Sequence, residues 1–269
     1  MKERESDIPV VLTIAGHDPG GGAGIQADIE AVSANRCYAA SVITCITVQD
    51  TCGLQQVLPQ PIAQIDAQAR AVLDDYKVEA IKIGLIGNIE IASWLADLLA
   101  EYHTIPVVLD PVLSSGAGTR LVDQTMEQVI RQQLLPFIDL ITPNSPEAYQ
   151  LTEGCKNLES CAETLLACGA RYVLITGTHE REERVVNRLY NPEGLFNEQA
   201  WDRLPGDYHG SGCTLSAAIA AFLAQGFSML DAVNEAQVYT WDALFNGLCL
   251  GRGQSIPDRF FALSRRDKP

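Results

Sequence analysis

The sequence has few basic residues and no long apolar run. Its 269 residues include 19 lysines and arginines against 34 aspartates and glutamates, which gives a net charge of -15. A surface of this charge repels nucleic acid and anionic membranes, so we expect neither as a partner. A phosphate ligand stays possible, because glycine loops and local dipoles bind phosphate within acidic proteins. No apolar run reaches the roughly 18 residues of a membrane helix, so we expect no membrane span.

The cysteines form no paired motif. There are eight, and none stands in a C-x-x-C pair, which argues against a zinc knuckle and a thioredoxin-type centre. Unpaired cysteines in apolar segments behave as small hydrophobic residues. Residues 1–8 are charged and lack the apolar core of a signal peptide. We therefore expect a cytoplasmic protein in a reducing compartment.

Short apolar runs alternate with longer amphipathic segments along a chain that is 47% hydrophobic. The runs predict buried strands at 10–15, 41–48, 80–83, 106–109, 138–141 and 172–176. The segments between them predict helices at 24–35, 61–76, 89–102, 124–135 and 158–168. Antiparallel strands are expected within 184–204, followed by helices at 212–225 and 229–248. This order predicts one α/β domain, 1–269, with a mainly parallel sheet between helices.

Polar residues follow several of the predicted strands. Gly16 follows the first, Gln49 the second, Asp110 the fourth and Asn144 the fifth. In open α/β sheets, ligands bind beyond the carboxyl ends of the strands. We therefore expect these loops to converge on one ligand-binding cleft.

The segment 209–214 is a glycine-rich turn that leads into an alanine-rich, apolar helix. The start of a helix has free N–H groups and partial positive charge, and Gly210 and Gly212 let the backbone approach an anion closely. The pattern favours phosphate binding, although a tight turn that packs a buried helix would look the same. Cys213 lies in the first helical turn, where we expect the thiolate to be favoured.

A second glycine run, 16–24, follows the first strand and opens a helix. It lacks the acidic residue about 20 positions further on that a dinucleotide fingerprint requires. It also lacks the Lys-Ser/Thr pair that ends a P-loop. A turn that covers a substrate is therefore the better interpretation.

Several segments together carry a resemblance to a known family. They are Ala-Gly-His-Asp-Pro at 15–19, Gly-Gly-Ala-Gly-Ile-Gln-Ala-Asp at 21–28, Thr-Val-Gln-Asp-Thr at 47–51, Ile-Lys-Ile-Gly-Leu-Ile-Gly at 81–87, Leu-Asp-Pro-Val at 109–112, Thr-Pro-Asn-Ser-Pro-Glu-Ala at 142–148 and Gly-Ser-Gly-Cys-Thr-Leu-Ser at 210–216. With these segments in this order, the chain resembles the hydroxymethylpyrimidine/phosphomethylpyrimidine kinases of thiamine biosynthesis, within the ribokinase-like superfamily.

The resemblance implies a three-layer α/β/α fold, a homodimer and two reactions at one site. ATP would phosphorylate the hydroxymethyl group of 4-amino-5-hydroxymethyl-2-methylpyrimidine, and then the resulting monophosphate to the diphosphate. Gln49 matches the family residue that hydrogen-bonds the aminopyrimidine, and a side-chain amide suits this because it both donates and accepts. Asp28, the Gly16 backbone and Leu85 match residues that line the same pocket.

The phosphate side of the site is implied in the same way. Asp110, Asn144 and Glu147 match the region that holds Mg²⁺ and the ATP phosphates, with Asp110 and Glu147 as the metal-binding acids. Thr176 matches an ATP contact. Magnesium takes few direct carboxylates and keeps waters, so two acids and an amide would suit it.

Cys213 stands where the sugar kinases of the superfamily carry a catalytic aspartate, and the resemblance implies that it is the base. A weak base suffices, because phosphoryl transfer needs mainly positioning and charge stabilisation. The amides of Gly210, Ser211, Gly212 and Cys213 would form the anion hole.

The sequence departs from the family pattern at four positions. His17 stands where a serine is usual and Gly20 where a serine is common. Ser211 replaces the usual threonine, and Thr176 lies in a stretch that often carries a lysine before two glycines. These departures affect the pyrimidine pocket and one ATP contact.

Other interpretations stay open. The alternatives for the protein are a pyridoxal kinase, because related cysteine-containing enzymes accept that ring, and a non-catalytic pyrimidine-binding regulator. A cysteine hydrolase built on Cys213 and His209 is a third class, with no evident orienting acid. Locally, Asp28 could be a solvated helix residue, and Asn144 with Glu147 could cap a helix.

Overall fold

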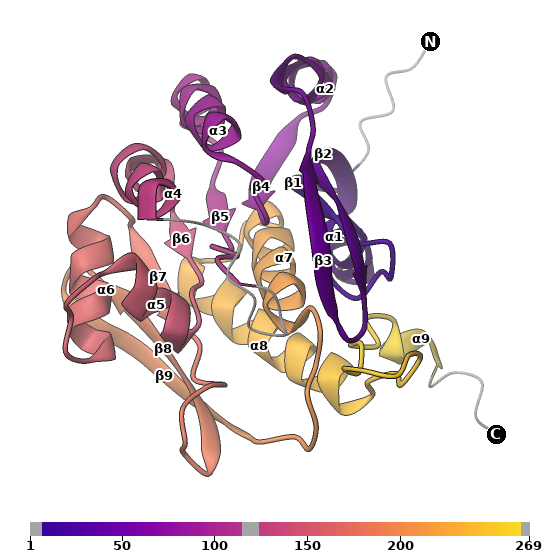
Figure 1. The fold of residues 1–269 in the computed structure, drawn as a ribbon, viewed down its shortest axis with the longest axis vertical. Helices are drawn as coiled ribbons and strands as arrows, with labels where there is room; N and C mark the ends of the chain where they lie inside the picture. Colours follow the sequence, from indigo (N-terminus) through magenta and orange to yellow (C-terminus); the bar gives the residue numbers. More distant parts are fainter. Residues whose placement is uncertain (1–6, 115–123, 265–269) are drawn as a thin grey trace.

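The computed structural model describes residues 7–114 and 124–264, and these form one mixed β-sheet covered by helices on both faces (Figure 1). The strand order is β3-β2-β1-β4-β5-β6-β7-β8-β9. The strands are β1 (Val10–His17), β2 (Tyr38–Asp50), β3 (Gly53–Pro59), β4 (Val78–Ile83), β5 (Val107–Leu109), β6 (Leu140–Ile141), β7 (Tyr172–Ile175), β8 (Arg184–Asn191) and β9 (Gly194–Asp202). The six central strands run parallel, while β3, β8 and β9 pair antiparallel at the edges.

The helices divide between the two faces of the sheet. They are α1 (Gly24–Ala34), α2 (Ile62–Asp75), α3 (Ile89–Glu101), α4 (Gln124–Val129), α5 (Ser145–Leu151), α6 (Leu158–Ala167), α7 (Ser211–Ala224), α8 (Met229–Phe245) and α9 (Phe261–Ser264). One apolar core lies between the sheet and α2 to α6, and the other between the sheet and α1, α7 and α8. This arrangement confirms the three-layer α/β/α sandwich, and burial on both faces explains why the central strands are continuous apolar runs.

The differences from the predicted elements have local causes. β3 was not predicted, because it is an edge strand with mostly exposed or partly exposed side chains and no apolar run. The helix expected at 124–135 ends as α4 and continues as a π-helical turn, Ile130–Leu134, and a 3₁₀ turn, Leu135–Phe137. Pro136 in that last turn cannot donate a backbone hydrogen bond, which ends the regular helix.

The parallel strands bring several chain segments to one edge of the sheet. The β1–α1 loop follows His17, Asp110 follows β5, and Asn144 and Thr176 form a parallel bridge just beyond β6 and β7. Helix α7 packs beneath β1, β4 and β5, so its first turn also reaches this edge. None of the helices in residues 7–114 and 124–264 is long and apolar enough to cross a membrane. Most of the charged segment 1–8 lies outside the described residues.

Candidate active site

The two glycine loops contact each other at the start of α7. Gly210 has a left-handed backbone with φ of 83°, and a Cβ there would overlap the Gly22 carbonyl oxygen. His209 Nε2 lies 3.0 Å from Asp18 Oδ2, while the Gly20 and Ala23 amides donate to the same carboxylate at 2.8 Å and 2.9 Å. Only glycine tolerates this backbone conformation and this close approach, so the contact with the first loop requires glycine at position 210.

The contact between the loops is partly electrostatic. Burial alone would raise the pKa of Asp18, but the His209 hydrogen bond and the Ala23 and Gly20 amides hold it below its usual value. His209 is therefore engaged by an acid that the sequence analysis had not recognised. The described contacts join His209 to Asp18 and not to Cys213, which removes the geometric basis for a cysteine hydrolase.

A buried ion pair lies beneath the loops. Lys82 Nζ in β4 lies 2.7 Å from Asp28 Oδ1 in α1, and both side chains are fully buried. Burial raises the pKa of Asp28 to about 6, although Lys82 opposes this shift. Burial would lower the pKa of Lys82, but the Asp28 charge raises it overall. The interpretation of Asp28 as a solvated residue is therefore wrong.

Lys82 is a residue that the sequence analysis missed as a member of the site. A lysine inside the apolar run 80–83 is rare unless it is paired, and that was the available signal. The charges of Asp28, Cys213 and Asp110 all act on Lys82, which places it at the centre of the site.

Cys213 lies in the first turn of α7, and the residue is partly exposed although its thiol is enclosed by protein. Burial raises the pKa of its thiol to about 12, with Lys82 lowering it and Asp110 and Asp28 raising it further. A hydrogen bond from the Gly24 amide also favours the thiolate, but it does not outweigh burial. The expectation that the helix start favours a thiolate is therefore wrong for the protein without ligands.

Asp110 joins β5 to the start of α7. It is 5% exposed, and Ser216 Oγ donates to its Oδ2 at 3.4 Å. Burial raises the pKa of Asp110, while Lys82 and hydrogen bonds from Cys213 and Ser216 lower it. The structure thus brings Asp110 and Cys213 into direct contact, although they are far apart in the sequence.

Asn144 and Glu147 form a capping box at the start of α5. The Glu147 amide donates to Asn144 Oδ1 at 2.9 Å, and the Asn144 amide donates to Glu147 Oε2 at 3.0 Å. The capping interpretation is confirmed. Burial raises the pKa of Glu147 to about 8, and the charge of Asp110 raises it as well.

The two buried acids fit a divalent cation. Asp110 and Glu147 repel each other in an environment that disfavours their charged forms, and a bound cation would relieve both penalties. Within 7–114 and 124–264, no three His, Cys, Asp or Glu side chains are grouped as a complete metal site. An incomplete protein shell agrees with the way Mg²⁺ retains waters and binds phosphates.

Thr176 lies beside the capping box. Its amide donates to the Pro143 carbonyl at 3.0 Å, and its carbonyl accepts the Ser145 amide at 3.2 Å. The ends of β6 and β7 therefore hold Asn144 and Thr176 side by side, as the bridge between them indicates.

Two of the other residues expected around the pyrimidine, Gly16 and Leu85, lie together. A Cβ on Gly16 would lie 2.7 Å from Cys45 Sγ and 3.1 Å from Leu85 Cδ2, so Gly16 and Leu85 are neighbours. Gln49 is partly buried near the end of β2, which extends past the end of β1. No described contact joins Gln49 to Cys213, and the two are therefore not brought together by direct contact.

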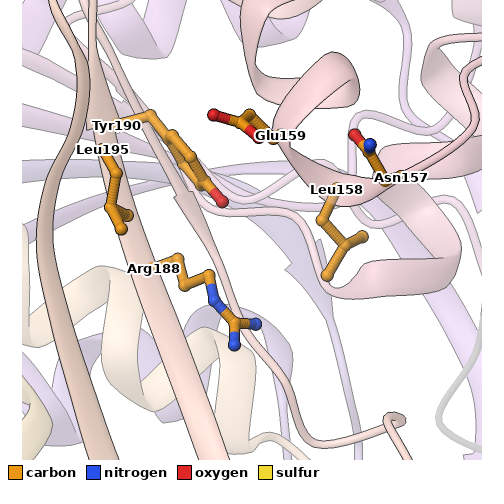
Figure 2. A pocket seen from close by; sticks show the side chains of 6 residues that line it. All are labelled: Asn157, Leu158, Glu159, Arg188, Tyr190 and Leu195. Atoms are coloured by element: carbon orange, nitrogen blue, oxygen red, sulfur yellow. The ribbon is translucent and has the colours of Figure 1, made fainter.

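A separate pocket of about 320 Å³ opens between the start of α6 and the β8–β9 hairpin (Figure 2). Its lining residues are Asn157, Leu158, Glu159, Arg188, Tyr190 and Leu195. None of them belongs to the residues predicted from the sequence. The Arg188 guanidinium is already paired with Glu198 at 2.8 Å. This pocket is distinct from the site at the start of α7.

Solved structures that share this fold include two small-molecule kinases. The ADP complex of Bacillus subtilis pyridoxal kinase is 31% identical, with a TM-score of 0.86 over 95% of this chain and 99% of that one. Phosphomethylpyrimidine kinase from Clostridium difficile is 36% identical, with a TM-score of 0.76 over 88% of this chain and 99% of that one. The fold and the site define a small-molecule kinase of the ribokinase-like class.

A model of the phosphomethylpyrimidine kinase family matches residues 18–258. The chain belongs to the phosphomethylpyrimidine kinase family. The hydroxymethylpyrimidine/phosphomethylpyrimidine kinase of Haemophilus influenzae is 37% identical over 97% of this chain and 99% of that protein. The chloroplastic thiamine biosynthetic bifunctional enzyme of Arabidopsis thaliana is 37% identical over 96% of this chain, which spans only 51% of that longer protein.

Proposed function

We propose that this protein uses ATP to phosphorylate 4-amino-5-hydroxymethyl-2-methylpyrimidine and then its monophosphate to the diphosphate, in thiamine biosynthesis. The observation that carries the proposal is the match, over almost the full length of both chains, to the Haemophilus influenzae enzyme named for both steps. The geometry supports it, because a helix start, two buried acids and a buried lysine meet at one edge of the sheet.

In this proposal the first turn of α7 holds the transferring phosphoryl group. No side chain caps that helix, so the amides of Ser211, Gly212 and Cys213 are free to donate to an anion. Amides fixed at a helix start stabilise charge that develops during the reaction. The left-handed backbone of Gly210 sets the direction of these amides.

Cys213 is the proposed base. With a pKa of about 12 the thiol is protonated in the resting protein, so its ionisation must accompany a change in its surroundings. Any ligand that neutralises Asp110 removes one of the charges that raise this pKa, and Lys82 then lowers it without opposition from Asp110. After losing its own proton to solvent, the thiolate would take the substrate's hydroxyl proton as the new P–O bond forms and the bond between ADP and the γ-phosphorus breaks, which releases ADP.

Magnesium is proposed at Asp110 and Glu147, where it would neutralise phosphate charge when bound. Asn144 and Thr176 are proposed to contact ATP. The Asn144 side-chain oxygen is engaged in the cap, but its side-chain NH₂ can still donate to a phosphate oxygen.

The pyrimidine is proposed to lie against Gly16 and Leu85, with Gln49 hydrogen-bonding the amino group and a ring nitrogen. Asp28 is proposed to act at the base of the same pocket. Because Asp28 is fully buried and bonded to Lys82, it would act on the substrate mainly through its charge and through Lys82.

Three broader expectations belong to the same proposal. The whole chain, 1–269, is proposed to be one kinase domain. A homodimer is proposed, and exposed apolar side chains of β2 and β3 (Ile46, Val48 and Leu58) offer a surface for it. A cytoplasmic location is proposed, in keeping with eight cysteines that form no disulfide.

A two-step assay tests the function. Purified protein with ATP, Mg²⁺ and the hydroxymethylpyrimidine should form the monophosphate and then the diphosphate, resolved by anion-exchange chromatography. The absence of both products from an active, folded preparation would contradict the proposal. Formation of the monophosphate alone would restrict it to the first reaction.

Pyridoxal phosphorylation is a second candidate. It is favoured by the TM-score of 0.86 with the Bacillus subtilis pyridoxal kinase, compared with 0.76 for the Clostridium difficile phosphomethylpyrimidine kinase. Values of kcat/KM for both rings, measured on one preparation, decide between the two, because specificity is the ratio of these constants.

A further inference from the structure

Arg259 is buried near the end of the described chain, and its side chain joins the two glycine loops. It is 2% exposed. Its Nη1 donates to the Gly21 carbonyl at 3.2 Å, and Nη2 donates to the Gly22 carbonyl. Its Nε donates to Thr214 Oγ1 at 2.9 Å, and Nη1 also pairs with Glu30 Oε2 at 3.0 Å. One side chain therefore links the first glycine loop, α1 and the first turn of α7.

Two of the segments that Arg259 links, the first glycine loop and the first turn of α7, also hold Cys213. The first glycine loop supplies the Gly24 amide that hydrogen-bonds the Cys213 thiol. Thr214 follows Cys213 directly, and its hydroxyl donates to the Gly210 carbonyl at 2.8 Å. A shift of the first glycine loop would break the Gly24 hydrogen bond, and the thiol would then be free to leave its position beside the amides of the proposed anion hole.

We infer that Arg259 is a positioning residue, which fixes the first glycine loop against the start of α7 and so aligns Cys213 with the transferring phosphoryl group. The inference rests on the proposed function. Arg259 lies one residue beyond the segment 18–258 that matches the family model. Burial raises the pKa of Asp28 and the charge of Arg259 opposes this shift, while the side-chain hydrogen bonds of Arg259 are to Gly21, Gly22, Thr214 and Glu30. It acts through Gly21, Gly22 and Thr214.

The chemistry of the guanidinium explains why an arginine is suited to this position. It is planar and has five N–H donors in a fixed fork, so it can serve four acceptors in three segments at once. A lysine has a point charge and cannot span them. The charge itself is compensated by Glu30, as a buried cation requires. Glycine loops lose much conformational freedom on folding, and a tether of this kind keeps them in one position.

Arg259→Lys tests the inference, because it keeps the charge and removes the fork. We expect kcat for pyrimidine phosphorylation to fall by about 10- to 100-fold, because a displacement of the catalytic thiol by about 1 Å lowers the rate this much. The KM for the pyrimidine should change little. Alkylation of Cys213 by iodoacetamide, followed by peptide mass analysis, should also change in rate. Arg70→Gln is the control, because Arg70 is an ion-paired arginine on α2 away from the site.

An unchanged kcat in Arg259→Lys, or an equal loss in Arg70→Gln, would overturn the inference. If Arg259→Lys does not fold, Thr214→Val decides, because it keeps the shape of the side chain and removes the hydroxyl that accepts from Arg259 and donates to the Gly210 carbonyl. Thr214→Val should lose kcat, and Thr214→Ser should recover it; equal activity of the two would also overturn the inference. An inactive wild-type protein would instead contradict the proposed function, so the two failures are distinguishable.

Discussion

Lys82 Nζ lies 2.7 Å from Asp28 Oδ1, and neither side chain is exposed to solvent. The second Asp28 oxygen has no hydrogen-bond partner within the described ranges of the chain. Such a pair is costly to bury, and removing one partner is costlier still. The pair also bears on the site, since both charges shift the pKa of Cys213.

The first prediction concerns this ion pair. Lys82→Met should lower the free energy of unfolding by about 3–5 kcal/mol, because it leaves the Asp28 carboxylate buried without its counter-charge. The double variant Lys82→Met/Asp28→Leu should recover much of this loss. Urea unfolding followed by circular dichroism measures both. A double variant that is less stable than Lys82→Met would show that the isolated charge is not the cause.

The second prediction concerns the pH dependence of Cys213. With a folded-state pKa of about 12, raised above the ordinary value of 9.0, the thiolate fraction should be very small at pH 7 and rise steadily above pH 9. Iodoacetamide alkylation of Cys213 should therefore be slow at neutral pH and show no plateau there. The exposed Cys52 serves as the internal reference for reagent reactivity. A Cys213 profile with a midpoint below pH 8 would contradict this assignment of the pKa.

The same raised pKa has a consequence for stability. A thiol whose folded pKa exceeds its unfolded pKa holds its proton more tightly in the folded protein. The contribution of Cys213 to stability is therefore fully present well below pH 9 and is lost as the pH rises from 9 toward 12. In Cys213→Ala, the free energy of unfolding should therefore decrease less steeply with pH above 9. Urea titration at several pH values measures this. If the unfolding free energy of Cys213→Ala falls equally steeply above pH 9, groups other than Cys213 cause the loss of stability.

The third prediction concerns the catalytic role of Cys213. Cys213→Ala should lower kcat far more than it raises KM for the pyrimidine, because an interaction made in the transition state affects kcat. Steady-state kinetics with both substrates varied makes the measurement. Cys168→Ala, a partly buried cysteine at the end of α6, is the matched control. An unchanged kcat would refute the role of base and leave the anion hole as the function of this segment.

The fourth prediction concerns the metal side. Glu147→Gln should raise the Mg²⁺ concentration needed for half-maximal activity, because it removes one of two proposed acidic ligands. It should leave KM for the pyrimidine nearly unchanged. Glu163→Gln on α6, an exposed glutamate, is the control. If Glu147→Gln alters pyrimidine binding and not the Mg²⁺ dependence, the assignment of this side of the site is wrong.

Much of the architecture was predictable from the sequence. The central strands are buried on both faces, so they are continuous apolar runs, and the alternation with helices predicted the three layers. β3 escaped prediction because an edge strand needs no such run. The helix α5 was foreseen only through its cap, because Asn144 and Glu147 indicate where a helix starts. Its seven residues are too few to show a clear helical repeat of apolar positions.

The site was only partly predictable. The glycine turn indicated Cys213, and the family resemblance indicated Asp110 and Glu147. The thiolate expectation considered the helix start alone and left out burial among acids. The role of Arg259 had no local signal, because its partners Gly21 and Gly22 lie more than 230 residues away. Only the fold brings such residues together, and a single sequence does not record that proximity.

The most direct test of the central claim is a competition of substrates on one preparation of the protein. Values of kcat/KM should be determined for the hydroxymethylpyrimidine, its monophosphate and pyridoxal, with ATP and Mg²⁺ held constant. We predict turnover of both pyrimidines and a lower kcat/KM for pyridoxal. A kcat/KM for pyridoxal that exceeds both pyrimidine values, or the absence of pyrimidine turnover, would contradict it.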